Sequence, residues 1–270
     1  MKYAPIIKKI DDLIGDSTFA YSGLFLALNW ILPRSWHLRR ELKLWNKTAN
    51  HHQCILDAGS GLGQNSAMVT SINKNWSVKG LDINSNLIAH CNRVFRKLNK
   101  VNAHFQTADL QTNFGTASYD LAMAIDIAEF VENDEVMFEN IQQALRPNGA
   151  MFLYTHLIDP DNPNKKKTRF KLVEEQRRFG YTRQSLKEKL KNAGFGRVKI
   201  RTVFGFAGNL SWKLAILIPL RLLNLSMLLG LILPFYFLLL FPLLLLLNYI
   251  ETHTGHLTGT ALFVKAQKSS

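Results

Sequence analysis

A glycine-rich loop is the segment of this sequence whose residue types and spacing best suit chemistry. Residues 57–63 read Asp-Ala-Gly-Ser-Gly-Leu-Gly, after a short apolar run that ends a predicted strand and before a predicted helix. Glycines let the backbone approach a ligand closely, and a helix N-terminus offers free amide donors to a carboxylate or a phosphate. The third glycine comes too early for the dinucleotide-binding fingerprint, and an acid precedes the first glycine. The loop therefore predicts a ligand other than a nicotinamide dinucleotide.

Titratable side chains that follow two later apolar runs are the candidates for acid–base chemistry. Asp126 and Glu129 follow the run 119–125, and His156 follows the run 150–155. A neutral imidazole near pH 7 suits a general base, and the alternative for His156 is a structural hydrogen bond to a loop carbonyl. The other histidines show no ligand spacing, and the 2 cysteines are too few for a disulfide framework or a cysteine-rich zinc site. No metal is predicted.

The elements that must position these residues alternate between strands and helices. Strands are predicted at 55–57, 76–82, 104–107, 119–125, 150–155, 196–204 and 258–265. Helices are predicted at 64–72, 84–98, 134–145 and 182–192, and Pro33 separates two further helical patterns before residue 50. Because this alternation is typical of a parallel sheet with helices on both faces, we expect an α/β fold. Ligands of such sheets bind at the carboxyl ends of the strands, where His156 falls.

Four further segments follow the loop in the order of one enzyme family's motifs. They are residues 78–83, which place an acid at the tip of the second strand, and residues 107–110, 119–126 and 145–150. From about residue 55 to residue 152 the chain resembles class I S-adenosylmethionine-dependent methyltransferases, with weaker support to residue 265. The run 125–131 is similar to the segment after strand four in methyltransferases of quinone biosynthesis, which commonly carry Leu-Glu-His there. Phe130 stands at the histidine position here, which puts a base or metal role at that position in doubt.

The resemblance implies S-adenosylmethionine as the cofactor and assigns residues to its parts. The backbone of the glycine loop would cradle the methionine part, with Asp57 favouring its ammonium. Asp82 would accept both ribose hydroxyls, which is a bidentate charge-assisted contact. Asp109 would accept a hydrogen bond from the adenine amino group, and the Leu110 amide would donate to the ring. The candidate cofactor-binding residues are Asp57, Gly59, Ser60, Gly61, Gly63, Asp82, Ile83, Asp109, Leu110 and Asp126.

The resemblance also sharpens the expected fold. It implies a doubly wound, seven-stranded, mostly parallel sheet of the Rossmann-like methyltransferase type, in which the sixth strand is parallel to the first five and the seventh returns antiparallel. We expect residues 1–50 to form an N-terminal helical cover, and residues 51–206 with 258–270 to form the methyltransferase domain. Residues 207–257 are expected to be an apolar helical insertion between the last two strands. That insertion should hang beside the active-site mouth.

The insertion is apolar enough to associate with a membrane. Arg221 is the one residue of 214–249 that is charged at pH 7, the phenols of Tyr236 and Tyr249 are the other ionisable groups, and the segment includes Pro234 and Pro242. Both ends of the insertion join one folded domain, and two membrane crossings would need about 20 residues each. A re-entrant or in-plane hairpin on the cytoplasmic side of a membrane is therefore favoured. The alternative is an apolar dimerisation element or a lid over a lipophilic pocket.

The charge of the chain is concentrated in one segment. The 270 residues include 33 Lys or Arg and 20 Asp or Glu, for a net charge of +13, and 47% hydrophobic residues exclude a disordered or fibrous chain. Between residues 165 and 201, 14 Lys or Arg stand against 3 Glu. A solvated helix face is one interpretation, but an apolar segment follows at once, so a polybasic patch against anionic lipid is favoured. The N-terminus shows no secretory signal.

Together these features predict a membrane-associated S-adenosylmethionine-dependent methyltransferase that acts on a lipophilic small molecule. Oxygen of a phenol, quinol or polyene-like compound is the favoured acceptor, and carbon methylation of an activated aromatic ring stays open. Because such a phenol can need a base, His156 and Glu129 are the catalytic candidates, whereas Asp126 is favoured as a cofactor or structural acid. A non-catalytic S-adenosylmethionine-binding membrane subunit of a biosynthetic complex is the second hypothesis, and a homodimer stays open. No nucleic-acid partner is predicted, since no Asn/Asp-Pro-Pro-aromatic motif follows strand four.

Overall fold

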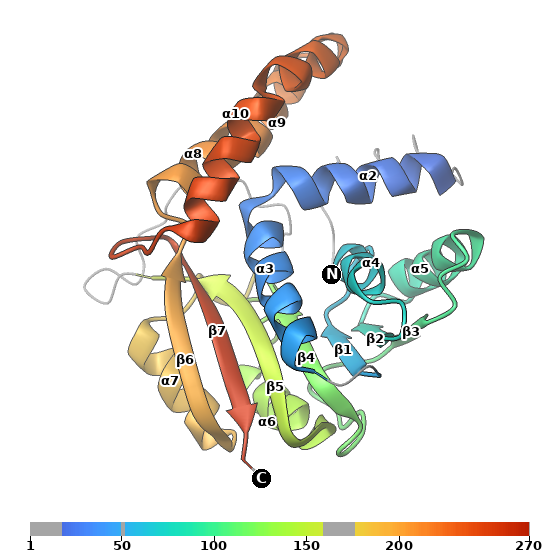
Figure 1. The fold of residues 1–270 in the computed structure, drawn as a ribbon, viewed down its shortest axis with the longest axis vertical. Helices are drawn as coiled ribbons and strands as arrows, with labels where there is room; N and C mark the ends of the chain where they lie inside the picture. Colours follow the sequence, from blue (N-terminus) through green and yellow to red (C-terminus); the bar gives the residue numbers. More distant parts are fainter. Residues whose placement is uncertain (1–17, 50–51, 159–175, 270) are drawn as a thin grey trace.

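A seven-stranded sheet runs through the centre of the computed structural model, which describes residues 18–49, 52–158 and 176–269 (Figure 1). Its strands are β1 Cys54–Ala58, β2 Ser77–Asp82, β3 Ala103–Thr107, β4 Tyr119–Ile125, β5 Leu145–His156, β6 Phe195–Val203 and β7 Ala261–Lys268. In space they follow the order β3-β2-β1-β4-β5-β7-β6. The first part of the predicted N-terminal cover and the basic residues at 165–171 lie outside the described residues.

The directions of the strands follow the expected pattern. Neighbours among β1 to β5 are parallel, whereas β7 pairs antiparallel with both β5 and β6. The predicted fold class is therefore confirmed. β5 begins at Leu145, earlier than the predicted residue 150, because Leu145 pairs with Tyr119 before a register shift leads to the regular pairing from Ala150 onward.

Helices cover both faces of the sheet. One face carries α2 Thr18–Ile31, α3 Pro33–Thr48, α4 Gln64–Ile72 and α5 Ser85–Lys97, and the other carries α6 Asp134–Ala144 and α7 Arg183–Asn192. Successive residues of a strand face opposite sides of a sheet, so Ile55 belongs to the core with Leu38, while Leu56 belongs to the core with Phe138. The predicted helix break at Pro33 is also confirmed, since α2 ends at Ile31 and Pro33 begins α3.

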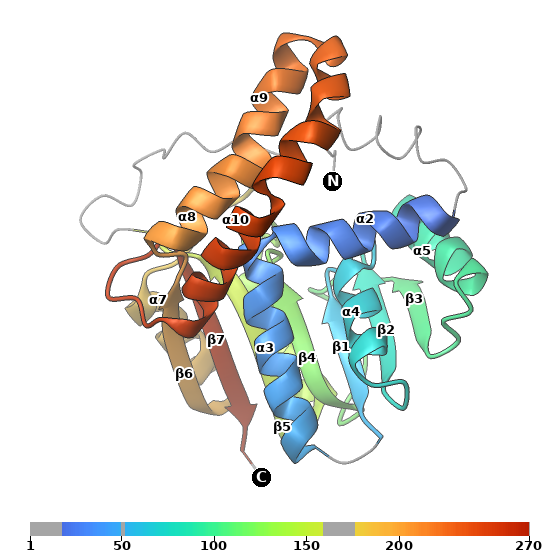
Figure 2. The same ribbon diagram turned by 45° about the horizontal axis from the view of Figure 1, so that its top comes forward.

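The insertion between β6 and β7 is a helical hairpin that projects from the sheet edge at which β5 ends (Figures 1 and 2). It consists of α8 Phe206–Trp212, a π-helical turn Lys213–Leu217, α9 Ile218–Leu225, a 3₁₀ turn Met227–Ile232 and α10 Leu233–His253. Pro219 and Pro234 lie in the first turns of α9 and α10, where proline is tolerated, and Pro242 lies inside α10. We call residues 206–253 the apolar hairpin.

The apolar hairpin exposes large apolar side chains. Leu228, Leu238 and Leu239 are 76%, 77% and 80% exposed. Residues 206–225 and 228–253 form two helices that are long and apolar enough to cross a bilayer, and only 6% of the most apolar window of the second is buried. This exposure fits both the predicted membrane contact and the alternative of an apolar dimerisation element.

Buried polar groups near the end of α10 fasten the apolar hairpin to the domain. The Glu251 carboxylate accepts hydrogen bonds from three backbone amides at the start of α8, those of Phe204, Gly205 and Gly208. It also lies 3.1 Å from Nε2 of His37 on α3. Asn248 Nδ2 donates to the two carbonyls at the end of α2. Because Glu251, Asn248 and His37 are all buried, these bonds hold the apolar hairpin in a fixed position against α2 and α3.

Some basic residues of the segment 165–201 bind other parts of the folded domain. Arg178 donates to backbone carbonyls of the loop after β4, Arg183 donates to the carbonyl of Ile200, and Lys189 pairs with Asp134 at 3.0 Å. These three cations therefore leave less charge for a lipid surface than the sequence indicated.

Candidate functional site

The glycine loop connects β1 to α4 through three residues in the left-handed region. Gly59, Gly61 and Gly63 have φ values of 76°, 52° and 80°, which residues with a Cβ rarely adopt. The amides of Gly59 and Ser60 donate to the carbonyl of Leu81 at 2.8 and 2.9 Å, which fixes the loop on the end of β2. A Cβ on Gly63 would lie 2.8 Å from the ring of Phe95. Packing as well as backbone geometry therefore requires glycine at position 63.

Asp82 joins the loop to the end of β2 and lines the candidate cofactor cavity. Its Oδ2 accepts a hydrogen bond from the Gly61 amide at 3.0 Å, and its Oδ1 accepts one from the Asn84 amide at 2.9 Å. Five predicted cofactor residues line one cavity of about 290 Å³: Gly59, Asp82, Ile83, Asp109 and Leu110. The structure thus brings together residues from three strand ends that are far apart in the sequence.

Asp57 and Ser60 belong to the loop, and both are buried. Asp57 Oδ2 accepts a hydrogen bond from the Ser66 hydroxyl at 2.6 Å, whereas Asp57 Oδ1 and Ser60 Oγ have no partner among the described residues. Burial is the main cause that raises the pKa of Asp57 to about 6, and the nearby Asp82 adds to it. A buried carboxylate with an unsatisfied oxygen is suited to a cationic group. The ammonium of S-adenosylmethionine fits that requirement.

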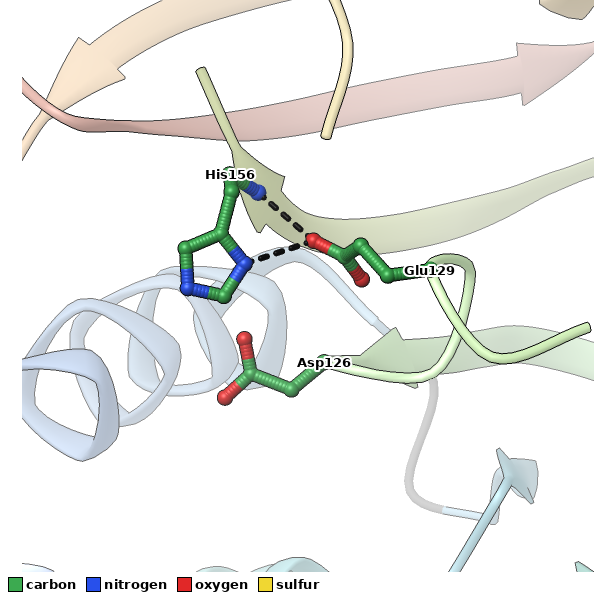
Figure 3. A group of neighbouring side chains, drawn as sticks. All are labelled: Asp126, Glu129 and His156. Carbon is green, nitrogen blue, oxygen red and sulfur yellow. Dashed lines mark hydrogen bonds and ion pairs between the residues drawn. The ribbon is translucent and has the colours of Figure 1, made fainter. Parts of the chain in front are cut away.

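Glu129 and His156 form an acid–imidazole pair at the ends of β4 and β5 (Figure 3). Oε1 of Glu129 accepts hydrogen bonds from the His156 amide at 2.7 Å, from His156 Nδ1 at 2.8 Å and from the Thr155 hydroxyl at 2.6 Å. A carboxylate only accepts, so this arrangement places the imidazole hydrogen on Nδ1. Nε2 is then the proton acceptor of a neutral ring. Glu129 is fully buried, while the His156 side chain is 27% exposed and can be reached.

Segments distant in the sequence hold this pair in place. The Tyr181 amide donates to the His156 carbonyl at 2.9 Å. Gly180, with φ of 142°, allows the close approach, because a Cβ there would lie 2.9 Å from the side chain of His156. Arg178 Nη1 donates to the carbonyls of Ala128 and Val131 at 2.6 and 2.7 Å, on either side of Glu129. The loop after β4 and the end of β5 are therefore fixed together.

Asp126 completes a cluster with the pair (Figure 3). It follows β4 directly, with φ of 54°, and its Oδ2 forms an ion pair with Nη1 of Arg34 at the start of α3. One ligand atom each from Asp126, Glu129 and His156 lies within 4.8 Å of the others, a spacing that could hold a metal ion. Arg34 pairs with the Asp126 carboxylate, and His156 pairs with the Glu129 carboxylate. That the site uses no metal stays a prediction.

Sequence reasoning missed three residues of this site. Arg34 and Arg178 do not follow a predicted strand, and no local pattern in the sequence indicates that they bind residues of the site. Thr155 had a signal, since it is a polar residue near the end of an otherwise apolar strand. Phe130, for which the sequence left a base or metal role in doubt, lines the cofactor cavity.

Comparison with known proteins places most of the described chain in one family. A family model described as a methyltransferase domain matches residues 34–200. The O-methyltransferase cnsE of Penicillium expansum is 31% identical over 114 residues, which cover 40% of this chain and 41% of that protein. The release factor glutamine methyltransferase of Buchnera aphidicola subsp. Acyrthosiphon pisum is 29% identical over 97 residues, which cover 36% of this chain and 35% of that protein. The chain spans less than half the length of these curated relatives.

A solved structure shares the fold. Phosphoethanolamine N-methyltransferase 2 of Haemonchus contortus, in complex with S-adenosyl-L-methionine, superposes with a TM-score of 0.63 at 17% identity, covering 97% of this chain and 60% of that one. The predicted enzyme class and cofactor agree with this family and with the molecule bound in that structure. The three names differ in what is methylated: the first gives an oxygen, the second a glutamine of a release factor and the third phosphoethanolamine, so they do not select one acceptor for this chain.

Proposed function

This chain belongs to the methyltransferase domain family, and we propose that it transfers a methyl group from S-adenosylmethionine to an oxygen of a lipophilic small molecule at the cytoplasmic side of a membrane. The matched residues 34–200 include every predicted cofactor residue and the Glu129–His156 pair. The acceptor, the acceptor atom and the membrane are the parts of the proposal that go beyond the family.

The observation that carries oxygen methylation is the geometry of the Glu129–His156 pair. A hydroxyl acceptor becomes a good nucleophile when a base removes its proton. Oε1 of Glu129 lies 2.8 Å from Nδ1 of His156 and accepts its hydrogen, which leaves Nε2 to accept the proton of the substrate hydroxyl. The buried carboxylate also stabilises the imidazolium once the proton has moved, as in other acid–histidine pairs. Glu129 is therefore proposed as a positioning residue and His156 as the general base.

The other residues of the site bind and orient. S-adenosylmethionine, when bound, supplies a methyl group that its sulfonium activates. Asp82 is proposed to hold the ribose, Asp109 the adenine, and Asp57 the ammonium, with the glycine loop beneath the methionine part. Asp126, fixed by Arg34, places a second carboxylate beside the base. The chain's main contribution is alignment of the reactants, with exclusion of water.

The position of the apolar hairpin supports a lipophilic acceptor. His156 at the end of β5 pairs with Ala261 at the start of β7, and Ala261 in turn pairs with Val203 at the end of β6. The end of β6 and the start of β7, which flank the apolar hairpin in the sequence, therefore lie in register with the base. Several exposed leucines, each contributing about 1.5–3 kcal/mol if fully buried, would hold this edge against a bilayer. An acceptor dissolved in that bilayer would arrive next to His156.

His156 provides the test of this proposal. We expect His156→Ala to lower turnover of a lipophilic phenol by about 10²–10⁴ while leaving affinity for S-adenosylhomocysteine unchanged. His104→Ala, at an exposed position on β3, is the matched control and should retain full activity. A loss below tenfold in His156→Ala would assign His156 a structural role.

Product analysis separates the alternatives. A methyl ether supports oxygen methylation, whereas a new ring methyl supports the aromatic carbon methyltransferase. Tight cofactor binding without transfer to any lipophilic acceptor supports the non-catalytic subunit. A concentration-dependent dimer that forms without lipid supports the dimerisation element.

A further inference from the structure

A second cavity lies on the helical side of the sheet that carries α2 to α5. It has a volume of about 640 Å³ and shares no described lining residue with the cofactor cavity. Its apolar walls come from Phe25, Trp30, Met68, Ile72 and Leu98. A cavity of this size is in the range of sites that bind small molecules.

Three cations line this cavity. Arg39 and Lys43 lie one turn apart on α3 and therefore share a face, and Lys100 joins them from the loop after α5. Lys100 Nζ is held by the Thr70 hydroxyl at 2.9 Å. The described lining residues include no acid.

The helices around the cavity contribute no negative charge to it. α2, α4 and α5 contain no Asp or Glu. The one acid of α3, Glu41, is bound by Arg201 and Lys265 of the sheet. The three cations therefore face a cavity whose other described lining residues are uncharged, so they have no counter-charge among the described residues.

Two of the cations are partly removed from water. Burial lowers the pKa of Arg39 and of Lys100. The Arg39 guanidinium lies over the Trp30 ring, 4.9 Å from its centroid, which fixes its orientation at the apolar wall. A desolvated cation without a counter-charge is stabilised when an anion binds beside it.

We propose that this cavity binds the phosphate of an anionic phospholipid, with Arg39, Lys43 and Lys100 on the phosphate and the acyl chains along the apolar walls. Leu26 of α2 lines the cavity and is 59% exposed, which extends the apolar wall to the surface. Trp30 connects the cavity to the apolar hairpin, because its carbonyl accepts a hydrogen bond from Asn248 of α10. The inference rests on the proposed function in one respect: the lipid would come from the membrane at which the protein is proposed to act.

A soluble short-chain lipid tests the site without a membrane. The purified full chain in detergent is mixed with dioctanoyl phosphatidylglycerol below its critical micelle concentration, and native mass spectrometry measures the bound fraction. We expect saturable binding, at least about tenfold tighter than that of dioctanoyl phosphatidylcholine, and no competition by millimolar inorganic phosphate.

Two variants locate the binding. Arg39→Gln with Lys43→Gln should weaken phosphatidylglycerol binding at least about tenfold. Lys47→Gln with Arg197→Gln removes the same charge from exposed positions that do not line the cavity, and should bind as the wild type does. Affinity for S-adenosylhomocysteine should stay unchanged in both. If the first variant loses that affinity, Lys43→Gln alone, at the exposed rim of the cavity, gives the same comparison.

The remaining outcomes overturn either the inference or the proposed function, and they can be told apart. Equal affinity for the two lipids, or an equal loss in the control variant, removes the anionic site. If inorganic phosphate competes and binds about as tightly as phosphatidylglycerol does, the cavity is a site for a soluble phosphate instead. Failure of methyl transfer while lipid selectivity persists contradicts the proposed function alone.

Discussion

Replacing Asp57 with asparagine should make the cofactor-free protein more stable at pH 7 and weaken its affinity for S-adenosylmethionine. Burial raises the pKa of Asp57 from 3.8 to about 6. At about 1.4 kcal/mol per pH unit, holding this charge in the folded protein costs about 3 kcal/mol at pH 7. Asparagine carries no charge and can still accept from the Ser66 hydroxyl, which donates to Asp57 at 2.6 Å.

The sign of the pH dependence follows from the raised pKa. The folded protein binds the Asp57 proton more tightly than the unfolded chain does, so this group should lower the free energy of unfolding as pH rises from about 4 to about 6. Asp57→Asn should lack that slope and melt about 5–10 °C higher at pH 7. Its affinity for S-adenosylmethionine should fall by about tenfold to a hundredfold through loss of a charged contact.

Thermal unfolding of the full chain in detergent, from pH 4 to pH 8 and with or without cofactor, measures both effects. Glu139→Gln, at an exposed position on α6, is the matched control and should change neither. If Asp57→Asn melts at the wild-type temperature at pH 7 and binds S-adenosylmethionine equally well, the reasoning about this buried carboxylate is refuted.

Further variants probe the rest of the structure. Gly61→Val should abolish cofactor binding, and Asp82→Ala should weaken it by roughly 1.5–3 kcal/mol for each lost ribose hydrogen bond; unchanged affinity of Asp82→Ala in calorimetry would contradict the cofactor assignment. Glu129→Gln should lower turnover by about 10²–10⁴ and alter its pH profile without affecting cofactor affinity, because the acid acts through His156. Glu251→Ala should lower the free energy of unfolding by about 3–5 kcal/mol, because it leaves buried donors without their acceptor; a smaller loss in chemical unfolding would mean that water replaces the carboxylate. Deletion of residues 214–249 should give a protein that leaves membranes, binds cofactor and loses activity on a lipophilic acceptor more than on a water-soluble analogue; a deletion that stays membrane-bound in flotation would show that the anchor lies elsewhere.

The sequence predicted the sheet and its helices because their signals are local. Apolar runs of strand length, amphipathic helices and the proline at position 33 each specify an element from neighbouring residues. The glycine loop was predicted for the same reason, since it follows an apolar run directly, whereas the role of Asp82 at the end of β2 came from the family resemblance. The antiparallel direction of β7 came from the family resemblance and is confirmed, whereas its place between β5 and β6 was not predicted.

The contacts that complete the site were not predictable in this way. Arg34 reaches Asp126 from 92 positions away, and only the packing of α3 on the sheet brings them together. Glu251 follows an apolar segment, where its charge gives no hint that three amides and His37 will surround it. Side-chain partners across such distances depend on tertiary packing, which periodicity does not encode.

Transfer of a labelled methyl group to lipids tests the central claim most directly. The purified full chain is incubated with methyl-labelled S-adenosylmethionine and a lipid extract, and the organic phase is counted and its products are separated. We expect label in a lipophilic methyl ether, no label with Gly61→Val, and a loss of about 10²–10⁴ with His156→Ala. Binding of the cofactor by the wild-type chain without label in any lipid product would contradict the central claim.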